Sequence, residues 1–164
     1  MTATWQIAPV ESAEALAAVR LLLEEYWDSF GFTPCFQNFG KEIAGLPGAY
    51  APPGGRLALA TSDGQPAGCI ALRPVDAHRA EAKRLYVRPA FRGHGLGRAL
   101  MEWVMAEARA GGYREIVGDT MPVMRDALAL YDRMGFERTG AGPEVQASPF
   151  PQVSEEPILI RIRL

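Results

Sequence analysis

Cysteine and histidine are scarce in this chain of 164 residues, which has two of each. Cys35 and Cys69 lie far apart and form no C-x-x-C pair, which favours two reduced thiols over a disulfide or a metal site. His78 and His94 are also isolated, so the ligands of a zinc site are lacking. We therefore expect a protein without a structural or catalytic metal.

The sequence also lacks an excess of charge of one sign and a long apolar run. The formal net charge is −2, which gives no general attraction to nucleic acid or to an anionic membrane. No stretch approaches the length of a membrane span, and the first residues do not resemble a signal peptide. We expect a cytoplasmic protein that binds neither nucleic acid nor membrane. Lysine is rare as well, since only Lys41 and Lys83 accompany the arginines.

The order of apolar patterns and turn residues predicts one domain, residues 1–164, of the α+β class with a mixed sheet. A Pro- and Gly-rich stretch, 46–55, is expected to be a loop that shapes a pocket, and 140–156 a second loop. The C-terminal strand is expected to complete the sheet of its own chain or of a partner in a homodimer. Helices are expected at 11–29, 36–45, 95–110 and 122–134, and strands at 5–10, 57–61, 66–74, 80–88, 113–119, 136–139 and 157–164.

The most informative segment joins the strand that ends near Arg88 to the helix that begins near Gly95. Three glycines, Gly93, Gly95 and Gly97, alternate through this turn. Glycine permits positive φ and lets a ligand approach backbone amides closely. The first amides of a helix lack intrahelical acceptors and, with the helix dipole, favour a phosphate. Arg92 and Arg98 add charged donors beside the turn, so we interpret it as a phosphate-binding loop.

Other interpretations of the turn can be compared with the sequence. A Walker A loop requires G-x-x-x-x-G-K-[ST], which does not occur here. A dinucleotide fingerprint G-x-G-x-x-G fails because Arg98 or Leu100 stands where the third glycine is needed. A third alternative is that the glycines only form a tight connection between strand and helix.

Two motifs resemble those of the GNAT superfamily of N-acetyltransferases. Arg92-Gly93-His94-Gly95-Leu96-Gly97 matches the pattern [QR]-x-x-G-x-[GA], and residues 127–136 look like the signature A-x-x-L-Y-x-x-x-G-F. They occur in the usual order, with one helix and one strand between them. The resemblance implies a mixed, mostly antiparallel, twisted sheet flanked by helices. It also implies an enzyme that transfers an acetyl or acyl group from acetyl-CoA to an amine of a small molecule, peptide or protein.

The same resemblance implies where the coenzyme lies. In such enzymes the loop amides bind the pyrophosphate, and the pantetheine arm runs along the preceding strand as an added β-strand. The residues implied to contact acetyl-CoA are Leu85, Tyr86, Val87, Arg92, Gly93, His94, Gly95, Leu96, Gly97 and Arg98. The donor to the thioester oxygen is expected to be a backbone N–H, that of Tyr86 or Val87.

Glu81 and Tyr131 are the candidates for proton transfer. Glu81 lies eleven residues before Arg92, where some GNAT enzymes carry a glutamate base, and it would act directly or through water. If the strand is regular, Glu81, Lys83, Leu85 and Val87 share one face, unless a bulge intervenes. Tyr131 aligns with the family tyrosine that hydrogen-bonds the coenzyme sulfur. The structural alternatives are an ion pair of Glu81 with Lys83 or Arg79 and an aromatic packing role for Tyr131.

The acceptor amine is not readable from the sequence. Weaker candidates for binding it are Tyr50, Arg73, Arg84, Asp119 and Thr120, on the segments expected around the cleft. Arg73 and Arg84 would suit an acceptor carboxylate, because arginine binds such groups bidentately. A second hypothesis, from a different class, is an acyl-CoA-binding regulatory module without catalysis.

Overall fold

A computed structural model describes residues 4–29, 39–120, 124–139 and 158–164. Within these ranges no helix is long and apolar enough to cross a membrane. The helical elements are α1 (Ala13–Asp28), α2 (Phe39–Ala44), η2 (Gly48–Tyr50), η3 (Pro89–Phe91), α3 (Leu96–Ala110) and α4 (Arg125–Met134). The strands are β1 (Gln6–Pro9), β2 (Arg56–Ser62), β3 (Gln65–Pro74), β4 (Arg79–Val87), β5 (Glu115–Thr120), β6 (Glu137–Thr139) and β7 (Ile158–Arg163).

The strands form one mixed sheet in the order β1-β2-β3-β4-β5-β7-β6. Neighbouring strands are antiparallel except β4 and β5, which are parallel. These two pair only over Arg79–Glu81 and Glu115–Val117, although both continue further. Beyond Glu81 and Val117 they therefore diverge, and the sheet opens at its centre. This α+β architecture confirms the fold expected from the sequence.

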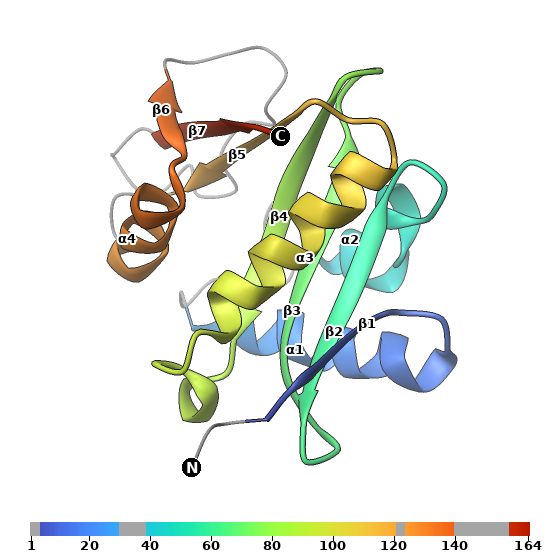
Figure 1. Cartoon of the computed structure of the whole chain (residues 1–164). Helices are drawn as coiled ribbons and strands as arrows, with labels where there is room; N and C mark the ends of the chain where they lie inside the picture. The colour runs from blue at the N-terminus through green and yellow to red at the C-terminus, as the bar shows by residue number, and fades with distance from the viewer. Residues whose placement is uncertain (1–3, 30–38, 121–123, 140–157) are drawn as a thin grey trace.

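Helices cover both faces of the sheet. Figure 1 shows α3 lying across one face, with α1 and α2 behind the other. The core under α3 and α4 includes Ile70, Leu100 and Ile116, and the core under α1 and α2 includes Leu22, Trp27 and Ala71. Ser12 caps α1 because its side chain accepts a hydrogen bond from the Ala15 amide at 3.1 Å. The diverging ends of β4 and β5 are thus enclosed from two sides.

A bulge interrupts β4 where the strands diverge. Lys83 pairs with Ala71 and Tyr86 with Cys69, so two residues of β4 lie opposite one of β3. Arg84 takes a φ of 61°, which is rare for a residue other than glycine. As a result Glu81 and Lys83 lie on the α1 side of the sheet, whereas Leu85 and Val87 pack against the α3 side. The prediction that all four side chains share one face of a regular strand is therefore wrong. The cause is a bulge, the exception that the prediction named.

Other element boundaries differ in detail. The predicted loop 46–55 contains a short 3₁₀ turn, η2, which buries Tyr50. The structure begins α2 at Phe39 and α4 at Arg125; the earlier starts at 36 and 122 fall outside the described residues, as do loop 140–156 and Cys35. The C-terminal strand β7 lies between β5 and β6 of the same chain. Its alternating isoleucines therefore complete this chain's own sheet.

Candidate active site

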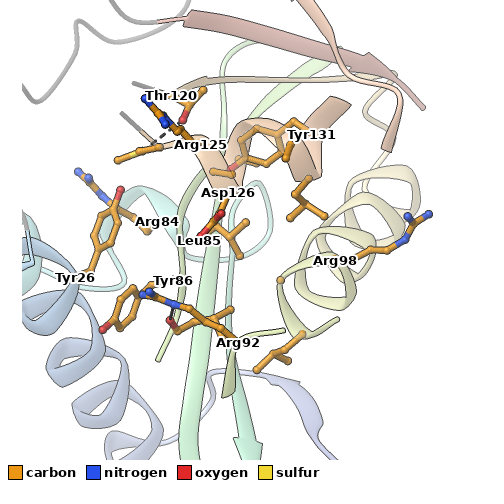
Figure 2. Close-up of a pocket in the computed structure, with 18 of the residues that line it drawn as sticks. Tyr26, Arg84, Leu85, Tyr86, Arg92, Arg98, Thr120, Arg125, Asp126 and Tyr131 are labelled. Atoms are coloured by element: carbon orange, nitrogen blue, oxygen red, sulfur yellow. Dashed lines mark hydrogen bonds between the residues drawn. The ribbon is translucent and has the colours of Figure 1, made fainter. Parts of the chain in front are cut away.

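A cavity of about 810 Å³ occupies the opening between β4 and β5. Figure 2 shows its labelled side chains, with Tyr26 and Arg84 on one side of the view and Tyr131 and Arg98 on the other. The lining comes from α1, β4, the loop before α3, the start of α3, β5 and α4. Its size and its mixture of apolar and charged groups are typical of a small-molecule site.

The glycine loop forms one end of this cavity. Gly93 and Gly95 have φ angles of 82° and 88°, and Gly95 is the residue that precedes the first turn of α3. The Ala99 amide donates to the Gly95 carbonyl at 3.0 Å, which is the first hydrogen bond of the helix. The amides of Leu96, Gly97 and Arg98 come before it and have no acceptor within the helix. These amides, at the positive end of the helix dipole, can bind an anion. The physical requirements of the predicted phosphate loop are present.

Arg92 and Arg98 flank this loop differently. Arg92 donates from Nε to the Val87 carbonyl at 2.8 Å, and its guanidinium lies 5.8 Å from the centre of the Tyr86 ring. This contact ties the loop to the end of β4. Arg98 forms an exposed pair with Glu102 one turn along α3. Both arginines line the cavity.

Nine of the ten residues predicted to contact the coenzyme line the cavity. They are Leu85, Tyr86, Val87, Arg92, Gly93, Gly95, Leu96, Gly97 and Arg98. His94 belongs to the loop, but its side chain is exposed and is not part of the lining. The structure therefore brings the predicted set together around one space, with His94 at its outer edge.

The backbone of β4 presents amides to the same space. The Arg88 N–H bonds to the Ala67 carbonyl on β3 at 2.9 Å. Because successive strand amides point to opposite edges, the N–H groups of Val87 and Leu85 are directed toward the open edge that faces β5. Two amides are expected from the sequence as donors to the thioester oxygen. That of Val87 points to the open edge, whereas that of Tyr86 points toward β3. The amide of Leu85 therefore replaces that of Tyr86 as the second candidate.

Glu81 is fully buried on the α1 side of the sheet. Arg73, its partner across the β3–β4 ladder, donates to Oε1, while Oε2 has no hydrogen-bond partner. Burial raises the pKa of Glu81, although the nearby Lys83 and Arg73 cations oppose this shift. Glu81 does not line the cavity itself. It lies behind the lining and forms an ion pair with Arg73, a cation other than Lys83 and Arg79, the two partners expected in the structural alternative.

Tyr131 lies in α4 and lines the cavity from the opposite side. Its ring packs against Phe136, with the ring centres 5.4 Å apart. Burial is the main cause that raises the pKa of its hydroxyl above the ordinary value. Tyr131 therefore remains protonated at neutral pH and is available as a hydrogen-bond donor inside the cavity.

Four polar residues on the two diverging strands line the cavity: Lys83 and Arg84 on β4, and Asp119 and Thr120 on β5. Arg84 donates two hydrogen bonds to Glu42, at 2.9 and 3.1 Å. Burial alone would lower the pKa of Arg84, but the Glu42 carboxylate and nearby tyrosines raise it. Burial lowers the pKa of Lys83 and raises that of Asp119. The two arginines suggested for an acceptor carboxylate, Arg73 and Arg84, are thus both engaged by carboxylates of the chain.

Two of the predicted acceptor residues lie elsewhere. Tyr50 and Arg73 line a separate cavity of about 240 Å³ beside α2 and η2. The Tyr50 hydroxyl donates to Glu42 Oε1 at 3.0 Å, so Tyr50 supports the Glu42–Arg84 pair from behind. Neither residue lines the main cavity. The loop 46–55 therefore does not bring Tyr50 into the opening between the strands.

Tyr26 and Met124 line the cavity although neither was among the site residues predicted from the sequence. Tyr26 belongs to α1, and its ring centre lies 5.6 Å from that of Tyr86. Burial raises the pKa of Tyr26 to about 12. In the sequence it continues the apolar stripe of α1, which predicts a core position. Met124 accepts a hydrogen bond from the Thr120 hydroxyl at 3.3 Å.

Comparison with known proteins shows the family of this chain. Residues 17–136 match the model of the acetyltransferase (GNAT) family. An uncharacterized N-acetyltransferase of Schizosaccharomyces pombe is 35% identical over 135 residues, which cover 81% of this chain and 83% of that protein. N-acetyltransferase family 8 member 2 of Rattus norvegicus is 31% identical, with 85% of this chain and 62% of that one covered. The chain belongs to the acetyltransferase (GNAT) family.

Solved structures show the same fold. An acetyltransferase from Streptococcus agalactiae superposes with a TM-score of 0.79 at 22% identity, over 98% of each chain. A GNAT family acetyltransferase from Elizabethkingia anophelis, whose structure contains bound acetyl-CoA, superposes with a TM-score of 0.70 at 22% identity, again over 98% of each chain. Within the described residues, no group of three or more His, Cys, Asp or Glu is arranged to hold a metal ion.

Proposed function

We propose that the protein transfers an acetyl group from acetyl-CoA to a primary amine of a small molecule or peptide. One observation carries this proposal: a single cavity connects the amides at the start of α3 with Tyr131 and the diverging edge of β4. An elongated thioester carrier needs an anion site at one end and an open strand edge along its length. Both are present in the required order.

The coenzyme diphosphate would bind the amides of residues 93–98, with Arg92 and Arg98 as charged donors. The pantetheine arm would follow β4 and bond to its open backbone edge in place of β5. The amides of Leu85 and Val87 point to this edge, so either can donate to the thioester oxygen as negative charge develops there. The acetyl-CoA-bound relative from Elizabethkingia anophelis, which has the same fold, supports this donor.

Tyr131 would assist departure of the coenzyme thiolate. Its raised pKa keeps the hydroxyl protonated, and a hydrogen bond to the sulfur stabilises charge as the carbon–sulfur bond breaks. Because a thiol has an ordinary pKa near 8.5, well below that of this tyrosine, we assign Tyr131 mainly to hydrogen bonding. Final protonation of the thiolate can then come from the attacking amine.

A base must deprotonate the acceptor ammonium. Glu81 is our first candidate, because burial raises its pKa toward the working range and Oε2 lacks a partner. It lies behind the lining, so it would act through a water molecule or another polar group. Asp119 is the second candidate, since burial raises its pKa too and it lines the cavity directly.

An acceptor screen tests the proposal. Purified protein is mixed with acetyl-CoA and a panel of amino acids, small amines and peptides, and thiol release is followed for each. Turnover that requires both an acceptor and the Tyr131 hydroxyl supports an acetyltransferase. Tight binding of acetyl-CoA with no turnover across the panel would instead favour the non-catalytic acyl-CoA-binding module.

A further inference from the structure

Lys83 is a primary amine carried by the chain itself into the cavity. It lies on β4, two residues after Glu81 and two before Leu85, and it lines the same space as the glycine loop and Tyr131. The bulge at Arg84 places Lys83 on the α1 side together with Glu81 and Ala71. Glu81, the first candidate for the base in the proposed function, lies on this same side.

The surroundings of Lys83 favour its uncharged form. Burial is the largest effect and lowers the pKa of Lys83, and the cation of Arg84 acts in the same direction. The carboxylates of Glu81, Asp119 and Glu42 oppose the shift but do not cancel it. Glu81 in turn has a raised pKa. Glu81 and Lys83 lie two residues apart on the same face of β4, and the charge of each shifts the pKa of the other. Transfer of a proton from the Lys83 ammonium to the Glu81 carboxylate replaces these two charges by two neutral groups, while Arg73 can still donate to Oε1.

Lys83 also lies two residues before Leu85, whose amide is a candidate donor to the thioester oxygen. Its amine is carried on a flexible four-carbon stem, which reaches past neighbouring strand residues. The amides of Val87 and Leu85, the candidate donors to the thioester oxygen, follow on the same strand. A nucleophile, a base and an oxyanion donor are thus held on one segment, which raises their effective concentration relative to free reactants.

We propose that Lys83 is a self-acetylation site, at which Nζ accepts the acetyl group of bound acetyl-CoA when the acceptor position is empty. The Lys83 ammonium first gives one proton to Glu81. The Nζ lone pair then attacks the thioester carbonyl carbon, a nitrogen–carbon bond forms and the carbon–sulfur bond breaks with its electrons on sulfur. The second amine proton passes to the thiolate, which gives an amide on Lys83 and free coenzyme thiol. This proposal rests on the proposed function of the cavity.

Lys41 provides the natural comparison. The two are the only lysines in the sequence, and Lys41 lies in α2, exposed, beside the separate small cavity. Chemical acetylation by acetyl-CoA in solution would favour exposed Lys41 over partly buried Lys83. Acetylation guided by the cavity would favour Lys83.

Mass spectrometry of the full chain tests the proposal. The protein is incubated with acetyl-CoA alone, and acetylation is located by digestion after arginine, which isolates Lys83 in the peptide 80–84. We expect one acetyl group on Lys83, at a first-order rate unchanged by dilution of the protein. The variant Lys83→Arg loses this acetyl group, Lys41→Arg keeps it, and Glu81→Gln forms it about tenfold or more slowly.

Several results would overturn the inference. These are an unmodified Lys83 after saturation with acetyl-CoA, equal labelling of Lys41 and Lys83, or a rate that rises with protein concentration. Calorimetry with acetyl-CoA is run on the same samples. Binding and acceptor-dependent turnover without Lys83 labelling would remove the inference and leave the proposed function intact, whereas absence of binding would remove the proposed function as well.

Discussion

The Glu42 carboxylate in α2 holds the Arg84 guanidinium of the β4 bulge by two hydrogen bonds, at 2.9 and 3.1 Å. Arg84 has a φ of 61°, and its guanidinium lies 5.4 Å from the centre of the Phe39 ring. The side chains of Arg84 and Glu42 are only 10% and 29% exposed, respectively. The short helix α2 thus holds the bulge of β4 in place, and at this bulge the side chains of β4 change from one face of the sheet to the other.

We expect Glu42→Gln to lower the free energy of unfolding by about 2–3 kcal/mol, because it leaves the buried Arg84 charge without its counterion. This loss is at or below the smallest losses typical of breaking a fully buried ion pair, because Glu42 is partly exposed. Urea unfolding followed by circular dichroism measures the change. Glu25→Gln is the matched control, since Glu25 pairs with Arg88 at the end of the same strand in a more exposed setting. It should cost about 1 kcal/mol or less, and equal losses would argue against a special role for the Glu42–Arg84 pair.

Tyr131→Phe is expected to lower kcat about 10- to 100-fold, the worth of a hydrogen bond to a charged leaving group. The affinity for CoA should change by less than about twofold, because the ring still lines the cavity. Thiol-release kinetics and calorimetry measure the two quantities. Tyr113→Phe serves as the control, since the Tyr113 hydroxyl donates to the Gly54 carbonyl at 2.8 Å away from the cavity. Parallel loss of kcat and CoA affinity in Tyr131→Phe would contradict a role in the reaction.

The identity of the base determines how kcat depends on pH. Burial raises the pKa of both Glu81 and Asp119. The base must be ionised to accept a proton, so the enzyme is inactive below the pKa of this carboxylate and active above it. We expect kcat to rise with pH through an apparent pKa above the ordinary carboxyl value of about 4. Glu81→Gln should abolish this limb and lower kcat about 100-fold or more, whereas Asp119→Asn should retain it. Loss of the limb in Asp119→Asn alone would identify Asp119 as the base.

Arg92→Ala is expected to weaken CoA binding about tenfold, because it removes a charged donor beside the glycine loop and the bond from Arg92 Nε to the Val87 carbonyl. The loss should shrink as salt concentration rises, since exposed charges are screened. Titration calorimetry at two ionic strengths measures both effects. The control variant Arg138→Ala removes an exposed arginine that pairs with Asp132 outside the cavity. The CoA affinity of this variant should equal that of the unmodified protein. A loss of the same size in Arg138→Ala would show that net charge, and not the loop, governs binding.

Local sequence signals predicted much of the fold and one end of the cavity. The strands β3 and β4, the helix α3 and the glycines before it follow from short-range patterns, and the structure places them as expected. The bulge at Arg84, where φ is 61°, has no such signal, and the carboxylate that holds this side chain belongs to Glu42, forty-two residues away. Packing of α1 against the sheet explains why Tyr26 lines the cavity, and pairing across the β3–β4 ladder explains why Arg73 contacts Glu81. Residue types predicted the chemistry available, whereas tertiary contacts decided which residues reach the cavity.

A crystal structure of the protein with acetyl-CoA tests the central claim most directly. We expect the diphosphate within hydrogen-bond distance of the amides of residues 93–98, the pantetheine arm along the open edge of β4, and the sulfur between that edge and the Tyr131 hydroxyl. A coenzyme bound elsewhere, or one whose sulfur lies away from Tyr131, would contradict the account.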